Sequence, residues 1–419
     1  MGLADIVRSI ENQHNKRGIV RRRAAGWLPQ ILPYTGYGSV DTVRVLARAV
    51  MADPAHHHSD PPAACAEPPA AHTKQPGRHI ATQRQLMYKP NNISADGERL
   101  HTGKTPFLPR TGAGNPSSAG NRVNEMVERA TQRAVDAQAQ AQRGWRQFFT
   151  TQVGYLPVTV SIGDVVISTR TDHSGYIDIV ADNHGLTPGW HNATITPAAG
   201  EAVTAPVIVV DPRAKWGIVS DIDDTILVTW LPRMLLAAWN SFVLPTDARQ
   251  AVVGMPELYR HLLSGDPHAP VFYLSTGAWN TAPAMQSFIR TNNLPEGPLL
   301  LTDWGPTPTG LFRSGESHKR TQLRNLLITL PNIQWYLIGD DGQHDPFIYD
   351  ELARDHPSRI RAIALRELNP VEQVLSHGTP STMESREIAA PPSVPVVRGR
   401  DGFEILEGFR AQSAAAPSA

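Results

Sequence analysis

Two aspartates at the end of a short apolar run are the residues of this sequence best placed to do chemistry. The segment Trp216 to Ile226 reads WGIVSDIDDTI, with Asp221 directly after the apolar run and Asp223 two residues later. Side chains of an extended strand alternate between its faces, so we expect the two carboxylates to share one site. Like charges held that close raise each other's pKa unless a cation lies between them. The spacing predicts a metal site with acid–base chemistry. The alternative is a solvated turn or a helix cap after a buried strand.

Further along the chain, other polar residues follow apolar runs or begin a helical pattern. Ser275 lies near the end of the run 271–276, Lys319 lies in the helical pattern GESHKRTQL, and Asp340 and Asp345 follow the run YLIG. Each alone has an ordinary explanation as a helix cap, a solvated lysine or an acidic loop. Taken together with the two aspartates, they form one ordered set of candidate site residues.

Apolar runs that alternate with helical patterns predict the fold that positions these residues. Continuous apolar strands separated by helices are typical of an α/β fold with a doubly wound parallel sheet, covered on both faces. Ligands bind such sheets at the carboxyl ends of the strands, where most of the candidate residues lie. The expected strands are 217–221, 271–276, 297–303, 335–341 and 360–367, and the expected helices are 255–264, 282–292, 319–327 and 346–355.

The part of the chain before this α/β region predicts a small β-sandwich. Short alternating segments separated by turn residues fill 150–211, and 43–50 alternates in the same way. We therefore expect a β-sandwich domain made of 31–52 and 150–211, in which 31–38 is a turn-rich connection. It carries no concentrated chemistry, so a role as scaffold or docking surface is expected.

The remaining segments are expected to hold no catalytic residues. Residues 1–30 form a basic helical arm, for which a solvated arm is favoured over an amphipathic membrane anchor. A Pro-, Ala- and Gly-rich composition predicts a disordered insertion at 53–118, followed by a helix at 119–149. A Pro-, Ser- and Ala-rich composition predicts a disordered tail at 376–419.

Composition and charge exclude several classes of protein. The chain has 419 residues, 41% of them apolar, and its 39 basic and 39 acidic side chains give a formal net charge of zero, which argues against bulk nucleic-acid binding. Its single cysteine, Cys65, excludes an intrachain disulfide and a thiolate zinc site. A secretory signal and a long uncharged apolar run are both missing from the sequence. We expect a cytoplasmic protein, at most peripheral on a membrane.

The order of the polar motifs resembles that of the haloacid dehalogenase-like hydrolases. The motifs read DIDDT at 221–225, YLST at 273–276, HKRTQL at 318–323 and GDDGQHD at 339–345. The resemblance implies a haloacid dehalogenase-like (Rossmannoid) phosphatase domain, which we assign to 212–375.

A narrower resemblance covers most of 31–52 and 143–368. The segments PYTGYG, RGWRQFFT, STRTDHSGY, GPLLLTDWG and LIGDDGQHDPFIYDELARDHPSRI look like the family of the yeast-type actin-patch phosphatidate phosphatase catalytic domain, of which we expect a bacterial member. One departure concerns the segment after the second strand, where the family often has Ser-x-Ser-Pro-Trp. This chain has STGAW at 275–279, so the loop on the substrate side is expected to differ.

The resemblance implies a Mg²⁺-dependent hydrolase of phosphoric monoesters that works through an aspartyl-phosphate. Asp221, the backbone carbonyl of Asp223 and Asp340 would hold Mg²⁺, an ion that suits a site made only of oxygen ligands. Asp221 would attack phosphorus, and Asp223 would protonate the leaving oxygen and then accept a proton from water.

The resemblance gives three further residues a part in this site. Ser275 would bind a phosphoryl oxygen, and Lys319 would offset the charge of nucleophile and phosphate. Asp345 would orient the metal's surroundings, or else it only caps the helix that begins near Pro346.

The substrate is expected to depend on what surrounds the site. The apolar stretch 226–245 binds acyl chains or docks on a membrane, or else packs as a core helix; both readings stay open. The chain has little length for a cap domain, which leaves the site open to a bulky substrate. These points favour phosphatidate at a membrane surface, with diacylglycerol as product. The alternatives are a phosphatase for a soluble phosphomonoester or phosphoprotein, and a non-catalytic phosphatidate-binding module.

Overall fold

The computed structural model describes residues 19–52, 151–228, 250–302, 315–342, 344–369, 372 and 394–415. Four expected features lie outside these ranges: the insertion at 53–118, the helix at 119–149, most of the apolar stretch 226–245, and the first part of the basic arm.

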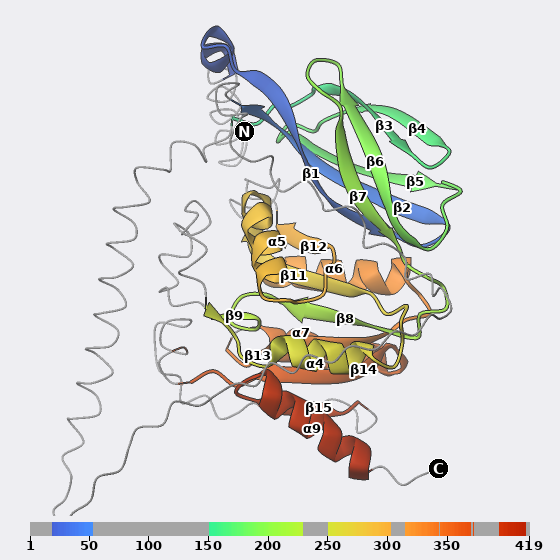
Figure 1. The fold of residues 1–419 in the computed structure, drawn as a ribbon, viewed down its shortest axis with the longest axis vertical. Coiled ribbons are helices and arrows are strands. Elements are labelled where there is room, and N and C mark those ends of the chain that lie inside the picture. The colour runs from blue at the N-terminus through green and yellow to red at the C-terminus, as the bar shows by residue number, and fades with distance from the viewer. Residues whose placement is uncertain are drawn as a thin grey trace, which may run out of the picture.

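The first described unit is a single curled sheet of seven strands (Figure 1). Its strand order is β4-β3-β6-β7-β1-β2-β5, and all neighbours are antiparallel except β1 and β7. Because all seven strands belong to one hydrogen-bonded sheet, the expected two-sheet sandwich is not confirmed. The strands are β1 (Leu28–Gly38), β2 (Thr42–Ala52), β3 (Pro157–Ile162), β4 (Val165–Arg170), β5 (Tyr176–Asp182), β6 (Gly189–Pro197) and β7 (Val203–Val209).

Strand β1 corrects one expectation, because 31–38 is not a turn-rich connection. The segment pairs with β2 along most of its length despite Pro29 and Pro33. Only Gly36, Tyr37 and Gly38 also pair with β7, so both prolines lie where the strand has a hydrogen-bonded neighbour on one side only. A proline is tolerated there because its missing N–H removes no bond from a sheet interior.

The second unit is a parallel sheet of six strands in the order β12-β11-β8-β13-β14-β15, which confirms the expected parallel α/β fold. The chain proceeds from β8 outward to β12 and then crosses back to β13 on the other side of β8. The strands β8 and β13 therefore flank a topological switch point, where ligands bind such sheets. The strands are β8 (Trp216–Asp221), β11 (Val271–Ala278), β12 (Leu299–Thr302), β13 (Gln334–Asp340), β14 (Ile360–Arg366) and β15 (Val396–Gly399). A small separate pair is formed by β9 (Leu227–Val228) and β10 (Gln250–Ala251).

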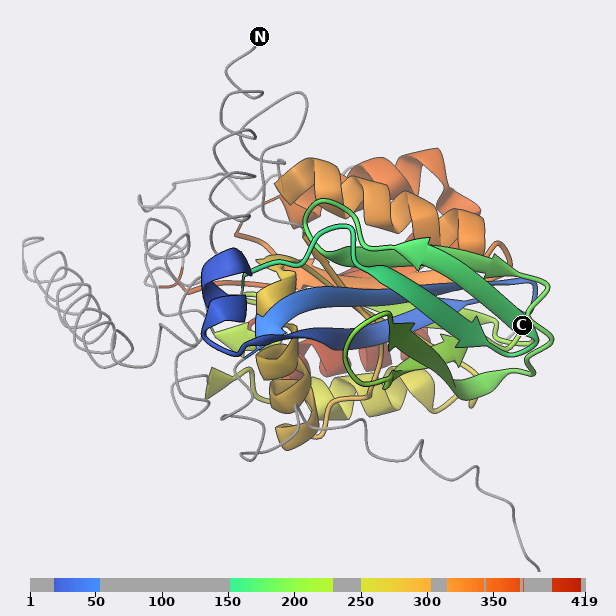
Figure 2. The same ribbon diagram turned by 90° about the horizontal axis from the view of Figure 1, so that it is seen from above.

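Helices cover both faces of the parallel sheet, and strand alternation explains which side chains each face receives. Ile218 packs in the core that contains α4, α5 and α9, whereas its neighbour Val219 packs in the core that contains α6 and α7. Figure 2 shows α6 and α7 on one side and α4 and α9 on the other. The helices are α4 (Met255–Leu263), α5 (Ala282–Thr291), α6 (Gly315–Thr329), α7 (Asp345–Asp355) and α9 (Gly402–Ala415), with the short 3-10 turns η4 (Trp279–Thr281) and η5 (Pro357–Arg359).

The expectation of a disordered tail at 376–419 is wrong for 394–415. Residues 396–399 add the parallel strand β15 beside β14, and α9 then packs across the sheet with Ile405 and Leu406 buried. The prediction from the Pro-, Ser- and Ala-rich composition overlooked two short apolar segments, VPVV and FEIL. They are long enough to extend the edge of a sheet and to cover it.

The curled sheet packs against the β11 side of the parallel sheet. The ring of Tyr34 lies 4.5 Å from that of Trp279, and the ring of Tyr37 meets Phe272 edge-on at 5.1 Å. Aromatic pairs of this kind add to the stabilisation that burial alone provides. The two sheets therefore share hydrophobic core.

Candidate active site

Asp221 is the last residue of β8, the strand that lies between β11 and β13 in the parallel sheet. The residue is 2% exposed. The chain then makes a tight turn in which the amides of Thr225, Ile226 and Leu227 all point to the carbonyl oxygen of Ile222, at 3.4, 3.1 and 3.2 Å. Since the strand stops at Asp221, strand alternation does not bring Asp223 to the same site as we expected. Instead, this turn brings Asp223 to the same edge of the sheet as Asp221.

Lys319 joins two of the candidate carboxylates. Its Nζ lies 2.6 Å from Oδ1 of Asp221 and 2.6 Å from Oδ1 of Asp345. The lysine is buried because α6 begins at Gly315, at the carboxyl edge of the sheet, and packs against β11 and β12. An ammonium group between two buried carboxylates offsets their mutual repulsion.

Three carboxylates, those of Asp221, Asp340 and Asp345, form one buried cluster. One oxygen of each lies within 4.8 Å of the others. Oδ1 of Asp340 accepts a hydrogen bond from the Gly342 amide at 2.7 Å. A Cβ at Gly339 would lie 2.5 Å from Oδ2 of Asp345, so the glycine is what allows this close approach.

The start of α7 shows where the Asp345 side chain lies. The N-cap position of α7 is His344, and the Asp345 side chain turns instead toward Lys319. The simple helix cap that we considered from the sequence is therefore not its arrangement.

Burial dominates the electrostatics of the cluster. Burial raises the pKa of Asp221 well above 3.8; Lys319 opposes this rise, and the neighbouring carboxylates add to it. Burial likewise raises the pKa of Asp340, with a further rise from Asp345. For Lys319 burial lowers the pKa, but the surrounding carboxylates outweigh it and the net pKa is raised. The lysine therefore stays charged, and a single positive charge faces three acidic groups.

The donor set fits a divalent cation. Three buried carboxylates with one lysine leave acidic groups that a hard cation would compensate, and oxygen-only ligands suit Mg²⁺. In addition, Oδ2 of Asp345 is buried and has no hydrogen-bond partner among the described residues. A buried oxygen without a partner is costly unless something binds it.

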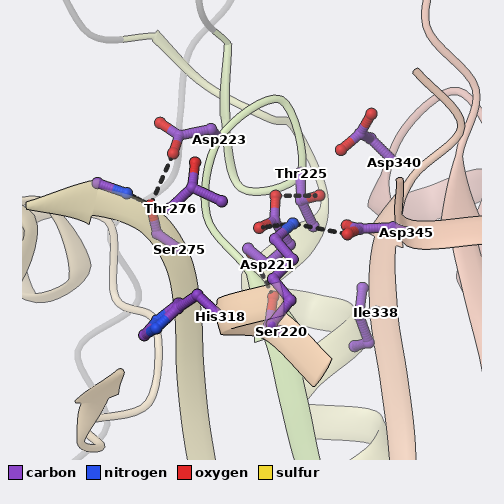
Figure 3. Close-up of polar contacts among 12 residues, drawn as sticks. Ser220, Asp221, Asp223, Thr225, Ser275, Thr276, His318, Ile338, Asp340 and Asp345 are labelled. Carbon is purple, nitrogen blue, oxygen red and sulfur yellow. Dashed lines mark hydrogen bonds and ion pairs between the residues drawn. The ribbon is translucent and has the colours of Figure 1, made fainter. Parts of the chain in front are cut away.

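Asp223 and Ser275 form a second, separate part of the site. Ser275 Oγ donates to Oδ2 of Asp223 at 2.8 Å and accepts from the Gly277 amide at 2.9 Å. Figure 3 shows the Asp223 carboxylate turned toward Ser275 and away from Asp340 and Asp345. The structure thus brings all six predicted residues to one edge of the sheet, but the side chain of Asp223 is not in the carboxylate cluster.

Several contacts behind Asp221 were not predicted from the sequence. Thr225 Oγ1 donates to Oδ2 of Asp221 at 3.3 Å. Tyr259 of α4 donates to Ser220 Oγ at 2.5 Å, and Ser220 in turn donates to the carbonyl of Asp221 at 2.7 Å. His318 lies buried beside Lys319, with Nε2 at 3.3 Å from the Leu300 carbonyl. Ser220, Thr225 and His318 had a sequence signal, since they stand inside the quoted segments, whereas Tyr259 had none.

Comparison with known proteins shows what this region of the chain is similar to. A family model described as "Phosphatidate phosphatase APP1, catalytic domain" matches residues 216–367. Phosphatidate phosphatase APP1 of Saccharomyces cerevisiae is 29% identical over 245 residues, covering 55% of this chain and 41% of that protein. An uncharacterized protein of Schizosaccharomyces pombe is 27% identical over 169 residues, covering 40% of this chain and 27% of that protein. The chain thus spans less than half the length of either relative.

A solved structure gives a weaker likeness. The HAD domain of effector protein Lem4 from Legionella pneumophila superposes with a TM-score of 0.26 and 14% identity, covering 38% of this chain and 89% of that chain. The region that the family model matches holds the whole candidate site, from Asp221 to Asp345. Residues 216–367 of this chain are therefore similar to the catalytic domain of phosphatidate phosphatase APP1.

Proposed function

We propose that the chain is a Mg²⁺-dependent phosphoric monoester hydrolase that converts phosphatidate to diacylglycerol through an aspartyl-phosphate on Asp221. The observation that carries this proposal is that two separate groups of side chains lie at one edge of the parallel sheet. Lys319 bridges Asp221 and Asp345, and Asp223 stands apart with Ser275. A nucleophile and a proton donor need different surroundings, and these two aspartates have them.

Each residue has a distinct task in this proposal. Asp221 attacks phosphorus and expels the alkoxide, while Asp223 donates a proton to that leaving oxygen and later takes one from the attacking water. Ser275, held by the Gly277 amide, hydrogen-bonds a phosphoryl oxygen. Lys319 keeps its charge and offsets the negative charge of nucleophile and phosphate together.

Mg²⁺ would be held by Asp221, Asp340 and the carbonyl of Asp223, with Asp345 alongside. When bound, the ion neutralises phosphate charge and so permits an anionic nucleophile to approach. The choice of Mg²⁺ rests on the oxygen-only donors and on the family.

The lipid substrate is supported by the family match and by exposed apolar side chains near the site. Val253, Phe347 and Phe403 are 59%, 40% and 46% exposed. They lie at the beginnings of α4, α7 and α9, and helices that follow parallel strands begin at the carboxyl edge, where the site is. Among the described residues, no helix is long and apolar enough to cross a membrane. On the basis of these three exposed apolar side chains, we propose peripheral contact of this edge with a lipid surface.

We also propose a division into domains. The curled sheet, made of 31–52 and 150–211, forms one domain, and the parallel sheet with its helices forms the phosphatase domain. Because β15 and α9 complete the parallel sheet, the phosphatase domain extends beyond 375 to include 394–415.

The test is phosphate release from phosphatidate in mixed micelles, with Mg²⁺ or with EDTA. The chain is compared with Asp221→Asn, which keeps the size of the side chain and removes the nucleophile. Glycerol phosphate and an aryl phosphate serve as soluble comparison substrates. We expect Mg²⁺-dependent release that favours phosphatidate and falls at least about a thousandfold in Asp221→Asn.

Two results would contradict the proposal in different ways. Equal or faster release from the soluble esters keeps the reaction and removes the lipid substrate. Binding of phosphatidate without release from any ester removes the enzymatic function and leaves a lipid-binding module.

A further inference from the structure

Arg366 is a buried cation that the proposed chemistry does not use. It ends β14 and is 6% exposed. Its guanidinium makes three kinds of contact: Nη1 donates to the carbonyl of Asp224 at 2.7 Å, Nη2 pairs with Glu372 at 2.6 Å, and Nε donates to the carbonyl of Arg400 at 3.2 Å. One side chain is therefore hydrogen-bonded to three segments that are far apart in the sequence, at residues 224, 372 and 400.

The main chain of Arg366 is hydrogen-bonded to the turn that follows Asp340. Its carbonyl accepts the Asp341 amide at 2.9 Å, directly after Asp340. Oδ1 of Asp341 in turn accepts the Leu368 amide at 2.9 Å. Arg366 thus lies between the turn that carries Asp223 and the turn that follows Asp340.

The turn after Asp221 needs external support. Asp224 has φ 58°, in the left-handed region, which costs residues other than glycine free energy, although aspartate adopts it more readily than most. Its carbonyl takes a charge-assisted hydrogen bond from Arg366, which is stronger than one from a neutral donor. The hydrogen bond from Arg366 therefore fixes the backbone at Asp224, the residue directly after Asp223.

We infer that Arg366 is a positioning residue, which holds the Asp224 carbonyl so that Asp223 keeps its carboxylate toward Ser275 and the leaving oxygen. This inference rests on the proposed function, in which Asp223 is the proton donor. Glu372 neutralises the guanidinium and fixes its orientation. Both Glu372 and Arg400 lie beyond the family match at 216–367, so the chain that follows the matched region completes the support of the catalytic turn.

Lysine cannot replace Arg366 in this arrangement. The three contacts use three different nitrogens of one planar fork, whereas an ammonium group is a single point on a flexible stem. Arg366→Lys therefore keeps the charge beside Glu372 and loses the bond that fixes Asp224.

The opposite end of β14 offers a matched control. Arg359, directly before the strand, also donates from three nitrogens, in its case to the carbonyls of Ile333, Leu327 and Leu330, at 3.1, 3.2 and 2.7 Å. It lies at the amino end of the strand, away from the site. Arg359→Lys thus removes a comparable set of bonds without touching the catalytic turn.

The test compares two soluble substrates, phenyl phosphate and dinitrophenyl phosphate, in Mg²⁺. Phenol is a poor leaving group that needs a proton donor, and dinitrophenol is a good one that does not. For Arg366→Lys we expect kcat/KM to fall about a hundredfold or more with phenyl phosphate and less than about tenfold with dinitrophenyl phosphate. Asp223→Asn should give the same pattern, and Arg359→Lys should lower both values by one common factor.

Equal losses on the two substrates in Arg366→Lys, or no loss on either, would overturn the inference and leave the proposed function intact. Failure of the unaltered chain to hydrolyse either ester or phosphatidate would overturn both. If Arg366→Lys does not fold, Glu372→Gln releases the guanidinium from its anchor. It should show a smaller loss with the same preference, and equal losses would again overturn the inference.

Discussion

Charge balance at the site depends on Lys319. This one buried ammonium faces the carboxylates of Asp221, Asp340 and Asp345, and the structure gives it direct contact with the first and third. Removing one partner of a buried ion pair typically costs more than the pair itself contributes, because a charge is left without compensation. A divalent cation would complete the compensation that the lysine begins.

The raised pKa values of Asp221 and Asp340 predict how stability depends on pH without metal. Since both values lie above 3.8 in the folded chain, their stabilising contribution is full below about pH 4 and is lost as pH rises through the raised values. Mg²⁺ favours the ionised carboxylates, so it should reduce this loss. The measurement is the unfolding midpoint between about pH 4 and pH 8, in EDTA and in Mg²⁺.

Asp340→Asn isolates this contribution from that of other titrating groups. In EDTA the variant should lose less stability with rising pH than the unaltered chain, because one of the crowded carboxyls no longer ionises. A variant that loses as much stability as the unaltered chain would show that the carboxylate cluster does not govern the effect.

Sequence reasoning located the candidate site residues, which the structure brings to one edge of the sheet, but not the residues that support them. Asp221, Ser275, Lys319 and Asp340 could be predicted because each follows a strand or belongs to a motif of fixed order. Contacts such as those of Tyr259 with Ser220, and of Arg366 with Asp224, join residues far apart in the chain. They depend on packing that no local pattern encodes.

At the scale of elements, periodicity located the parallel strands and their helices and failed where composition dominated. The expected strand at 335–341 and helix at 346–355 appear as β13 and α7. By contrast, prolines concealed β1, and a Pro- and Ala-rich setting concealed β15 and α9. In these regions, packing against the neighbouring sheet, and not local composition, decides whether a strand or a helix forms.

Helix α9 should be necessary for a stable parallel sheet. Ile405 is fully buried in the core that also contains Ile338 and Ala364, so Ile405→Ala should lower the free energy of unfolding by about 2–5 kcal/mol. Urea denaturation of the variant measures this. The exposed neighbour Glu407 provides the control, and Glu407→Ala should change stability by less than about 0.5 kcal/mol. A stability loss no larger for Ile405→Ala than for the control would show that α9 contributes little.

At the scale of the molecule, the two sheets share core and should unfold together. Tyr34 is 3% exposed and its ring lies against that of Trp279, which directly follows β11, the strand that carries Ser275. We expect one calorimetric transition, which Tyr34→Ala shifts as a whole to lower temperature. Val166→Ala, at a 66% exposed position of the curled sheet, should leave it unchanged. Two transitions, only one of which moves, would contradict a shared core.

The central claim is that Asp221 attacks phosphorus, and the stereochemistry of the reaction tests it most directly. A thiophosphate monoester made chiral with oxygen isotopes is hydrolysed by the chain in isotopically labelled water with Mg²⁺, and the configuration of the product is determined. Attack by Asp221 followed by attack of water is a double displacement, which predicts net retention at phosphorus. Net inversion would mean a single direct attack by water and would contradict the account.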